Sequence, residues 1–429
     1  MKTYNKPNKE QWEKLVQRPV INDEQLSQTV SSIIDDVKQN GDHSLIKYAK
    51  KFDGVNLNSL TVSVEEINNA IEKVPQELKD AIQVAYNNIS IFHKAQEIQE
   101  EVIETTPGVK CWRKSVAIEK VGLYIPGGSA PLFSTILMLG IPAQIAGCKK
   151  LVLCTPPNNN QEINPAILYT ANLVGIREIY KAGGAQAIAA MAYGTETIPQ
   201  VYKIFGPGNQ YVTKAKELVQ QSGVAIDMPA GPSEVLVIAD DSCNPAFVAS
   251  DLLSQAEHGI DSQVFLLSDN QKVNEKCLTE VYQQIELIPR KKIALKALEN
   301  SKAIVLNNLD ECISFSNQYA PEHLIIATER ANKYINKIIN AGSVFLGNYS
   351  CESAGDYASG TNHTLPTNGY AKSYSGVSLD SFIKKITFQE LSKEGINNLG
   401  KTIELMAEAE GLIAHKNAVS LRLKENNND

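Results

Sequence analysis

The sequence predicts an α/β fold with two parallel-sheet domains, a helical arm at the start and a helical tail at the end. Two observations carry this prediction. From Lys149 onward, short apolar runs alternate with stretches of helical periodicity, and the alternation occurs in two successive sets. The segments before and after these sets are mainly helical in pattern. Because parallel neighbours are joined by crossover helices, this alternation is typical of parallel sheets.

The two sets of elements meet near residues 227–233. In the first set, we expect strands at 151–154, 178–181, 203–205 and 224–226, with helices at 166–174, 186–192 and 211–220. In the second, we expect strands at 234–239, 263–267, 303–306, 324–327 and 343–346, with helices at 245–257, 273–285 and 332–340. Residues 22–99 and the polar tail from 378 onward read as helices. Two such sets predict two domains with a cleft between them.

Size, composition and charge narrow the class of protein. The 429 residues suggest two to three domains, and 43% hydrophobic with 21% charged residues is an ordinary globular balance. A net charge of −7 without a long basic block argues against nucleic-acid binding. The polar N-terminus and the short apolar run 136–148 argue against a signal peptide and a membrane span. Seven cysteines without CxxC spacing fit a reducing cytoplasm.

One group of polar residues suggests a metal site. Gln255 and His258 are three residues apart at the end of an expected helix, so their side chains point the same way. Taken singly, His258 is more typical of a helix C-cap and Asp356 of a turn. Together, two histidines, Asp356 and an amide oxygen could form a nitrogen-and-oxygen metal site with room for a substrate. No thiolate is needed, which favours a catalytic over a structural metal.

Glu322 and His323 form an acid–base pair directly after Pro321, at the start of an expected strand. Histidine near its unperturbed pKa is a natural base for taking the proton of an alcohol. The structural alternative is an ordinary pair at a strand edge. Strand alternation would also send the two side chains to opposite faces, unless the strand begins at Leu324.

Three glycine-rich turns lie next to expected strands, at 124–129, 182–186 and 205–209. None matches GxGxxG, and in the closest of them Tyr211 occupies the position of the last glycine. They are weak evidence for dinucleotide binding, because strand-to-helix turns need glycine in any case. They do place three loops at strand ends, where ligands collect in parallel sheets.

Several longer segments, in order, resemble the histidinol dehydrogenase family over essentially the whole chain. Near the start these are Asn40-Gly41-Asp42 and Lys51-Phe52-Asp53-Gly54. The others are 122–129, 204–209, 227–234, 254–259, 320–323, 353–366 and 409–419. Several unusual motifs in the right order are far more specific than any single pattern, so the chain is identified as a member of this family.

The resemblance implies one zinc ion per active site, with histidinol's amino and imidazole nitrogens completing its shell. The implied zinc ligands are Gln255, His258, Asp356 and His415. His415 would reach over from the partner subunit of a homodimer. The implied substrate contacts are Ser233, Gln255, His258, His323, Asp356, His363, Glu410 and His415.

The resemblance also implies NAD as cofactor, lying against Tyr124, Gln186 and Asn209 in a Rossmann-like domain without the usual fingerprint. The implied fold is aldehyde-dehydrogenase-like. The implied reaction takes L-histidinol to L-histidine through the aldehyde, in two hydride transfers, as the last step of histidine biosynthesis. His323 would be the base of the alcohol step, and Glu322 would activate the water that hydrates the aldehyde.

We expect four segments along the chain. Residues 1–18 form an N-terminal arm, and residues 19–124 with 233–377 form a discontinuous α/β domain that carries the metal and substrate site. Residues 125–232 form an inserted Rossmann-like NAD domain. Residues 378–429 form a helical tail that reaches the partner subunit.

Two further questions concern the chemistry. Cys351 lies five residues before Asp356, where proline is expected in many relatives. A thiol there could form a thiohemiacetal with the aldehyde, but nothing nearby suggests an activated thiol, and we interpret Cys351 as a turn residue. A zinc dehydrogenase for another amino alcohol would carry the same site residues and stays an alternative. A non-catalytic or hydrolytic protein is disfavoured, because Glu322, His323 and every expected ligand are present.

Overall fold

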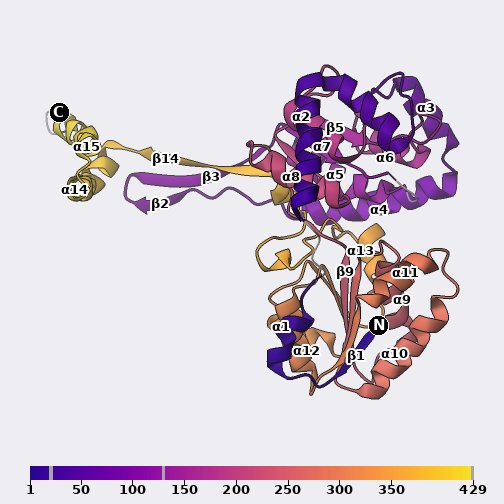
Figure 1. Cartoon of the computed structure of the whole chain (residues 1–429). Coiled ribbons are helices and arrows are strands. Elements are labelled where there is room, and N and C mark those ends of the chain that lie inside the picture. The colour runs from indigo at the N-terminus through magenta and orange to yellow at the C-terminus, as the bar shows by residue number, and fades with distance from the viewer. Residues whose placement is uncertain (19–22, 128–130, 427–429) are drawn as a thin grey trace. The chain divides into compact units, whose positions relative to one another are not determined.

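The computed structural model describes residues 1–18, 23–127 and 131–426, and Figure 1 shows its helices and strands. The chain divides into two compact units. The first comprises Met1–Gln96 and Ile118–Ser381, and the second comprises Glu97–Ala117 and the chain from Phe382 onward. Among the described helices, none has the length and apolarity that crossing a membrane needs.

The first unit contains a five-stranded parallel sheet in the order β6-β5-β4-β7-β8. Its strands are β4 (Lys120–Tyr124), β5 (Lys150–Thr155), β6 (Glu178–Lys181), β7 (Lys203–Phe205) and β8 (Ala225–Ile226). Its crossover helices are α5 (Phe133–Ala146), α6 (Pro165–Leu173), α7 (Gly184–Tyr193) and α8 (Gln210–Gln220). The strand order reverses at β4, and such a reversal leaves a crevice at the carboxyl ends of the strands.

Helices that precede this sheet in the chain pack on its crossover helices. They are α2 (Asp23–Tyr48), α3 (Val64–Lys73) and α4 (Gln76–Lys94), with a π-helical turn η1 (Ala49–Asp53) after α2. α2 packs on α7 and α8, α3 on α6, and α4 on α5. α2 buries Val30, Ile33, Ile34 and Val37, whose spacing places them on one helical face. They join one hydrophobic core with α7 and the strands.

A six-stranded parallel sheet, also in the first unit, has the order β1-β11-β10-β9-β12-β13. Its strands are β1 (Lys2–Asn5), β9 (Glu234–Ala239), β10 (Gln263–Ser268), β11 (Lys302–Val305), β12 (His323–Ala327) and β13 (Ser343–Leu346). One face is covered by α9 (Pro245–Ala256), α10 (Gln271–Gln284) and α11 (Lys291–Glu299), and the other by α1 (Lys9–Leu15) and α12 (Leu309–Tyr319) (Figure 1).

The central strand β9 shows why the strands of this sheet could be predicted from the sequence. Val235 and Val237 enter the core on the α9 side, whereas Leu236 and Ile238 enter the core on the α12 side. A strand covered on both faces is apolar at every position rather than at alternate ones. The short elements of this part of the chain are η2 (Ala331–Lys337), α13 (Glu352–Tyr357), η3 (Tyr370–Lys372) and η4 (Leu379–Phe382).

The second unit is a ribbon of strands followed by two helices. Its antiparallel strands are β2 (Ile103–Thr106), β3 (Val109–Ala117) and β14 (Ile383–Leu391), in the order β14-β3-β2. The helices α14 (Lys393–Ala409) and α15 (Ile413–Asn426) pack on each other. Many large apolar side chains of this unit are exposed, among them Ile103, Phe388, Leu405, Met406, Ile413 and Leu421.

The predicted α/β fold with two parallel sheets is confirmed, and the nine expected strands all form, with ends shifted by one residue at most. Four details differ. The strands β2, β3 and β4 were not among those expected. The expected helix 332–340 is the shorter 3-10 helix η2. The tail is not purely helical, because β14 pairs with β3. The N-terminal arm is not only helical either, because β1 joins the six-stranded sheet.

The packing also divides the chain differently from the expected boundaries. Residues 19–124 were expected with the metal-site domain, but α2, α3 and α4 pack against the helices of the five-stranded sheet. β4, at the end of that range, is the central strand of the same sheet. The arm of residues 1–18 instead adds the strand β1 to the six-stranded sheet, and its helix α1 packs on one face of that sheet. An amphipathic pattern shows that a helix has a buried face, but not which sheet covers it.

Candidate active site

The expected catalytic residues and Gln255 gather at the amino edge of the six-stranded sheet. Glu234 opens β9 and His323 opens β12, so both lie where parallel strands begin. α9 runs back against these strands and ends at Ala256, which brings Gln255 to the same edge.

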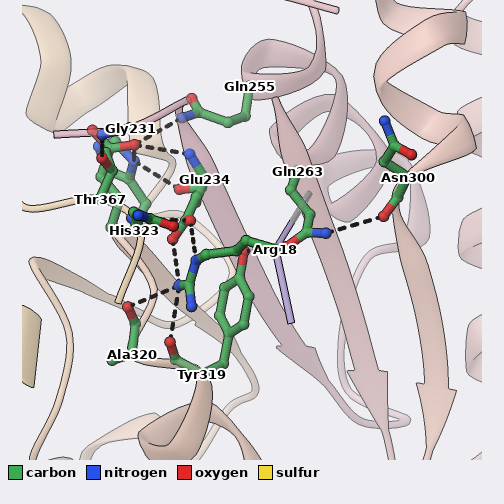
Figure 2. Close-up of polar contacts among 12 residues, drawn as sticks. Arg18, Gly231, Glu234, Gln255, Gln263, Asn300, Tyr319, Ala320, His323 and Thr367 are labelled. Carbon is green, nitrogen blue, oxygen red and sulfur yellow. Dashed lines mark hydrogen bonds and ion pairs between the residues drawn. The ribbon is translucent and has the colours of Figure 1, made fainter. Parts of the chain in front are cut away.

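The backbone of Glu234 holds the acid–base pair in place. Its N–H donates to Oε2 of Glu322 at 2.9 Å. Its carbonyl oxygen lies 3.3 Å from Nδ1 of His323, and Figure 2 labels both of these residues. Gln255 Nε2 donates a second hydrogen bond to Glu322 Oε2 at 3.2 Å. Glu322 precedes β12, so strand alternation does not separate the pair, and both side chains are buried. Since a carbonyl only accepts, Nδ1 of His323 carries a proton, and Nε2 is the nitrogen that can gain or lose one.

Three carboxyl groups surround the His323 ring. Nε2 lies 3.5 Å from Asp356 Oδ1, and Nδ1 lies 3.7 Å from Glu322 Oε2 and 4.0 Å from Glu352 Oε1. Burial alone would lower the pKa of His323, but the charges of these carboxylates outweigh it and raise the pKa to about 10. Burial raises the pKa of Glu322 to about 7, against the opposing charge of His323. Burial also raises the pKa of Glu352 well above its ordinary value, and a bound cation would favour the ionised form of both glutamates.

The donor atoms of this edge fit a zinc ion. Gln255 Oε1 and Asp356 Oδ1 are buried and have no hydrogen-bond partner among the described residues. His323, Glu352 and Asp356 also offer ligand atoms that all lie within 4.8 Å of one another. Unsatisfied nitrogen and oxygen donors are the chemistry that zinc takes at catalytic sites. Asp356 belongs both to this group and to the ligand set expected from the sequence.

The remaining site residues expected in the first unit are Ser233, His258 and His363, and they differ in their exposure and contacts. Ser233 and His258 line a cavity of about 1200 Å³, and His258 is exposed to it beyond the end of α9. His363 is half-buried, and both of its ring nitrogens are engaged: Nδ1 contacts the Asp356 carbonyl at 2.8 Å, and Nε2 contacts the Thr135 hydroxyl at 3.0 Å. A substrate that binds His363 must therefore share or replace the Thr135 contact.

The three residues expected to contact NAD line one cavity of about 1300 Å³ at the carboxyl edge of the five-stranded sheet. Tyr124 ends β4, and Gln186 lies in the first turn of α7. Asn209 caps α8, its Oδ1 accepting hydrogen bonds from two backbone N–H groups of the first turn. The N-termini of α7 and α8 thus face this edge, and their positive ends suit the diphosphate of a dinucleotide.

The glycine-rich turns let backbone segments approach one another closely at this edge. At Gly206, φ is +131°, and a Cβ there would overlap the carbonyl oxygen of Tyr124. The hydroxyl of Tyr124 accepts a hydrogen bond from the N–H of Gly184 at 3.0 Å. Of the first turn, Gly128 and Ser129 lie outside the described residues.

Sequence reasoning did not single out Arg18 and Glu352. Arg18 Nη2 donates to Glu234 Oε2 at 2.8 Å and to the carbonyl of Tyr319 at 2.9 Å, and its guanidinium lies 4.0 Å from the centre of the Tyr319 ring (Figure 2). Arg18 thereby neutralises the buried carboxylate of Glu234, whose backbone holds the acid–base pair. No pattern links Arg18 to a glutamate 216 positions later. The signal for Glu352 was its place in the polar segment just before Asp356.

Glu410 and His415 belong to the second unit. Glu410 is the C-cap of α14, His415 lies in α15, and both are exposed. Their expected contribution to the site of a partner subunit stays a prediction.

Comparison with known proteins decides the family. The sequence model of the histidinol dehydrogenase family matches residues 16–423. The chain belongs to the histidinol dehydrogenase family. A histidinol dehydrogenase of Bacteroides thetaiotaomicron is 59% identical over 423 residues, which cover 99% of each chain. One of Haemophilus influenzae is 54% identical and covers 96% of each chain.

A solved structure agrees with this membership. The crystal structure of histidinol dehydrogenase from Elizabethkingia anophelis has a TM-score of 0.97 at 62% identity and covers 100% of this chain and 99% of that one. The family predicted from the sequence is confirmed, and with it the class of enzyme, an oxidoreductase of a family that uses NAD and zinc.

Proposed function

We propose that this protein oxidises L-histidinol to L-histidine through histidinaldehyde, the last step of histidine biosynthesis. Family membership along the whole chain supports the substrate. The observation that carries the mechanism is the meeting of His323, Glu322, Gln255 and Asp356 at one sheet edge. When bound, NAD supplies the hydride acceptor, and zinc supplies a Lewis acid that anchors the substrate's nitrogens.

His323 is assigned as the base of the alcohol step. Its Nδ1 is held by the carbonyl of Glu234, so Nε2 is the atom that would take the alcohol proton. The neighbouring carboxylates raise the pKa of His323 to about 10, and a zinc ion held by Asp356 would offset their charge and lower that pKa, which leaves Nε2 free to accept the proton. Nε2 has no hydrogen-bond partner within the described chain and faces Asp356, one of the proposed zinc ligands. The substrate would thus be anchored beside its base, which provides the orientation that a hydride transfer needs.

Glu322 is assigned to the hydration of the aldehyde. The hydrogen bonds from Glu234 and Gln255 both fall on Oε2, so we assign the proton taken from water to Oε1. The proposed zinc ligands are Gln255 through Oε1, His258, Asp356 and His415 of a partner subunit. Ser233, His363 and Glu410 are proposed as further substrate contacts, and Tyr124, Gln186 and Asn209 as NAD contacts.

The function is tested by following NADH formation from histidinol and NAD. We expect two NADH per histidinol, loss of activity when a chelator removes the metal, and recovery when zinc is added back. The chelated protein should keep its fold, because no compact thiolate site ties the chain together. Full activity after verified metal removal would overturn the zinc role. Other amino alcohols are tested as substrates in the same assay. If one of them were oxidised more efficiently than histidinol, the proposed substrate would be wrong.

We further propose a homodimer with shared active sites and a cytoplasmic location. The second unit exposes many large apolar side chains, and a short ribbon with two helices buries little by itself. In the proposed dimer, a second copy of the chain covers these side chains, and His415 of one subunit binds the zinc ion of the other. The seven free cysteines suit a reducing compartment, which cell fractionation can test.

The shared site is tested by complementation. His415→Ala and Gln255→Ala chains should each be inactive, yet recover activity when mixed through unfolding and refolding. In a mixed dimer one site carries both defects and the other carries neither. Random pairing makes about half the dimers mixed, so activity should recover to about a quarter of wild type. Mixed dimers that form but stay inactive would show that His415 acts within its own chain.

A further inference from the structure

The segment Lys51-Phe52-Asp53-Gly54 carries part of the family resemblance but has no role in the chemistry described so far. The structure places Lys51, Phe52 and Asp53 on the wall of the 1300 Å³ cavity that holds the proposed NAD contacts. Asp53 ends the π-helical turn η1, and Gly54 closes it in the left-handed conformation with φ of 71°. A π-turn closed by glycine is a local departure from α2 and is often found at functional sites.

Asp53 is a half-buried residue of that wall with one unsatisfied carboxyl oxygen. Its Oδ2 is buried and has no hydrogen-bond partner in the part of the chain that the structure describes. Burial raises the pKa of Asp53 above its ordinary value. Next to it, the ring of Phe52 stacks on Tyr48 with centroids 5.4 Å apart and planes 3° apart, and Phe52 is 52% exposed. A buried acceptor beside an exposed aromatic ring suits a ligand with hydroxyl donors and a flat apolar ring.

The two cavities of the first unit fix which end of a dinucleotide reaches this wall. The NAD cavity and the cavity of His258 and Ser233 share three lining residues: Pro126, Gly127 and Asn209. Hydride transfer needs contact between the nicotinamide and the substrate, so the nicotinamide belongs at the shared residues. Phe52 and Asp53 line only the NAD cavity. The adenosine end of the cofactor is therefore the one left for them.

This chain lacks the usual ribose ligand of a dinucleotide-binding sheet at its usual position. In such folds, an acidic residue about 20 residues beyond the glycine-rich turn, after the second strand, binds the ribose hydroxyls. Here the second strand, β5, ends at Thr155 and is followed by Pro156, Pro157 and Asn158, none of which is acidic. Two carboxyl groups nevertheless line the cavity, Asp53 and Glu162. Glu162 is exposed, whereas Asp53 has a buried oxygen.

We propose that Asp53 accepts hydrogen bonds from the adenosine ribose hydroxyls of NAD, that Phe52 supports the adenine ring, and that Asp53 thereby excludes NADP. This inference rests on the proposed NAD-linked function. A 2′-phosphate would remove the donor and place negative charge against the carboxylate, so one residue both binds NAD and rejects NADP. Lys51, also on this wall, has its Nζ 5.2 Å from the centre of the Phe52 ring. Without the Asp53 charge, this cation would favour a 2′-phosphate.

The test is direct binding of NADH and NADPH to the full-length protein, measured by titration calorimetry without histidinol. Losing a hydrogen bond to a charged group costs about 1.5–3 kcal/mol, so Asp53→Asn should weaken NADH binding about tenfold or more. NADPH binding should stay the same or improve. Glu162→Gln, which removes the other carboxylate of the cavity, should change either affinity less than about twofold.

The fold of the variant is checked by its thermal midpoint. Asp53→Asn replaces a half-buried carboxyl group, whose Oδ2 has no hydrogen-bond partner among the described residues, by a neutral amide of the same shape, so the thermal midpoint should stay the same or rise. An unchanged NADH-to-NADPH ratio in Asp53→Asn, or an equal loss in Glu162→Gln, would overturn the ribose role while leaving the NAD-linked function intact. Wild-type protein that binds no NADH would overturn both.

Discussion

The two parallel sheets of the first unit use opposite edges. The five-stranded sheet carries its cavity at the carboxyl ends of its strands, beside Tyr124 and Asn209. The six-stranded sheet carries Glu322, His323 and Gln255 at the amino ends of its strands. Open α/β sheets usually bind ligands at the carboxyl edge, so only the first sheet follows that rule.

Helix ends explain why each edge suits its ligand. At the carboxyl edge, α7 and α8 begin, and the partial positive charge of helix N-termini suits the phosphates of NAD. At the amino edge, α9 and α12 end, and the partial negative charge of helix C-termini suits cations. Arg18 already binds at the end of α12, where the carbonyl of Tyr319 accepts its hydrogen bond. The same architecture thus suits an anion at one edge and a cation at the other.

The largest effect is expected from the amino edge. His323→Asn removes the proposed base and should slow oxidation of the alcohol on the order of a hundredfold or more. Asn209→Ala, at the carboxyl edge, should instead act mainly on the KM for NAD. Steady-state rates with histidinol and with NAD varied separately distinguish the two. If both variants changed kcat and the KM for NAD to the same extent, the two edges would not have the separate roles proposed for them.

A second test separates the proposed role of Glu322 from that of His323 at the amino edge. Glu322→Gln should spare the alcohol step and slow conversion of the aldehyde to the acid, by about tenfold or more. The alcohol and the aldehyde are supplied separately to each variant, and NADH formation is followed. If Glu322→Gln slowed both steps equally, Glu322 would be a structural partner of His323 and not the group that activates water.

A third test asks whether Arg18, the positively charged side chain at the amino edge, stabilises the fold. Arg18→Met leaves the buried carboxylate of Glu234 without its partner, and breaking a buried pair costs about 3 kcal/mol or more. The unfolding midpoint in denaturant should fall clearly. Lys149→Met, which removes an exposed pair with Glu119, is the matched control and should leave the midpoint nearly unchanged. Equal midpoints for both variants would contradict a stabilising role for Arg18.

Burial explains how much of the fold the sequence predicts. Strands such as β9, apolar at nearly every position, were predicted because both of their faces are covered. β1, β2, β3 and β14 were not predicted, because these strands carry exposed polar residues in sequences such as KTYN and IKKITFQEL. The buried strand β4, KVGLY, was not predicted either, since it is short and has a glycine, which is disfavoured in strands, at its centre. The acid–base pair was visible as adjacent residues. Its support was not, because Arg18 and Glu234 are distant in the sequence and meet only through the fold.

The smallest effect is expected from Cys351, the one thiol near the proposed zinc ligand Asp356 in sequence. The residue is exposed and is the N-cap of α13 in extended conformation, and its side chain makes no capping hydrogen bond. The buried polar groups of the amino edge are Glu234, Gln255, Glu322, His323 and Glu352, and the exposed Cys351 is not one of them. Cys351→Ala should therefore stay within a few-fold of wild-type activity, with an unchanged thermal midpoint. Mass spectrometry of the enzyme quenched during turnover checks the chemistry directly. A covalent aldehyde adduct on Cys351 would establish a thiohemiacetal route and move the aldehyde step from Glu322 to the thiol.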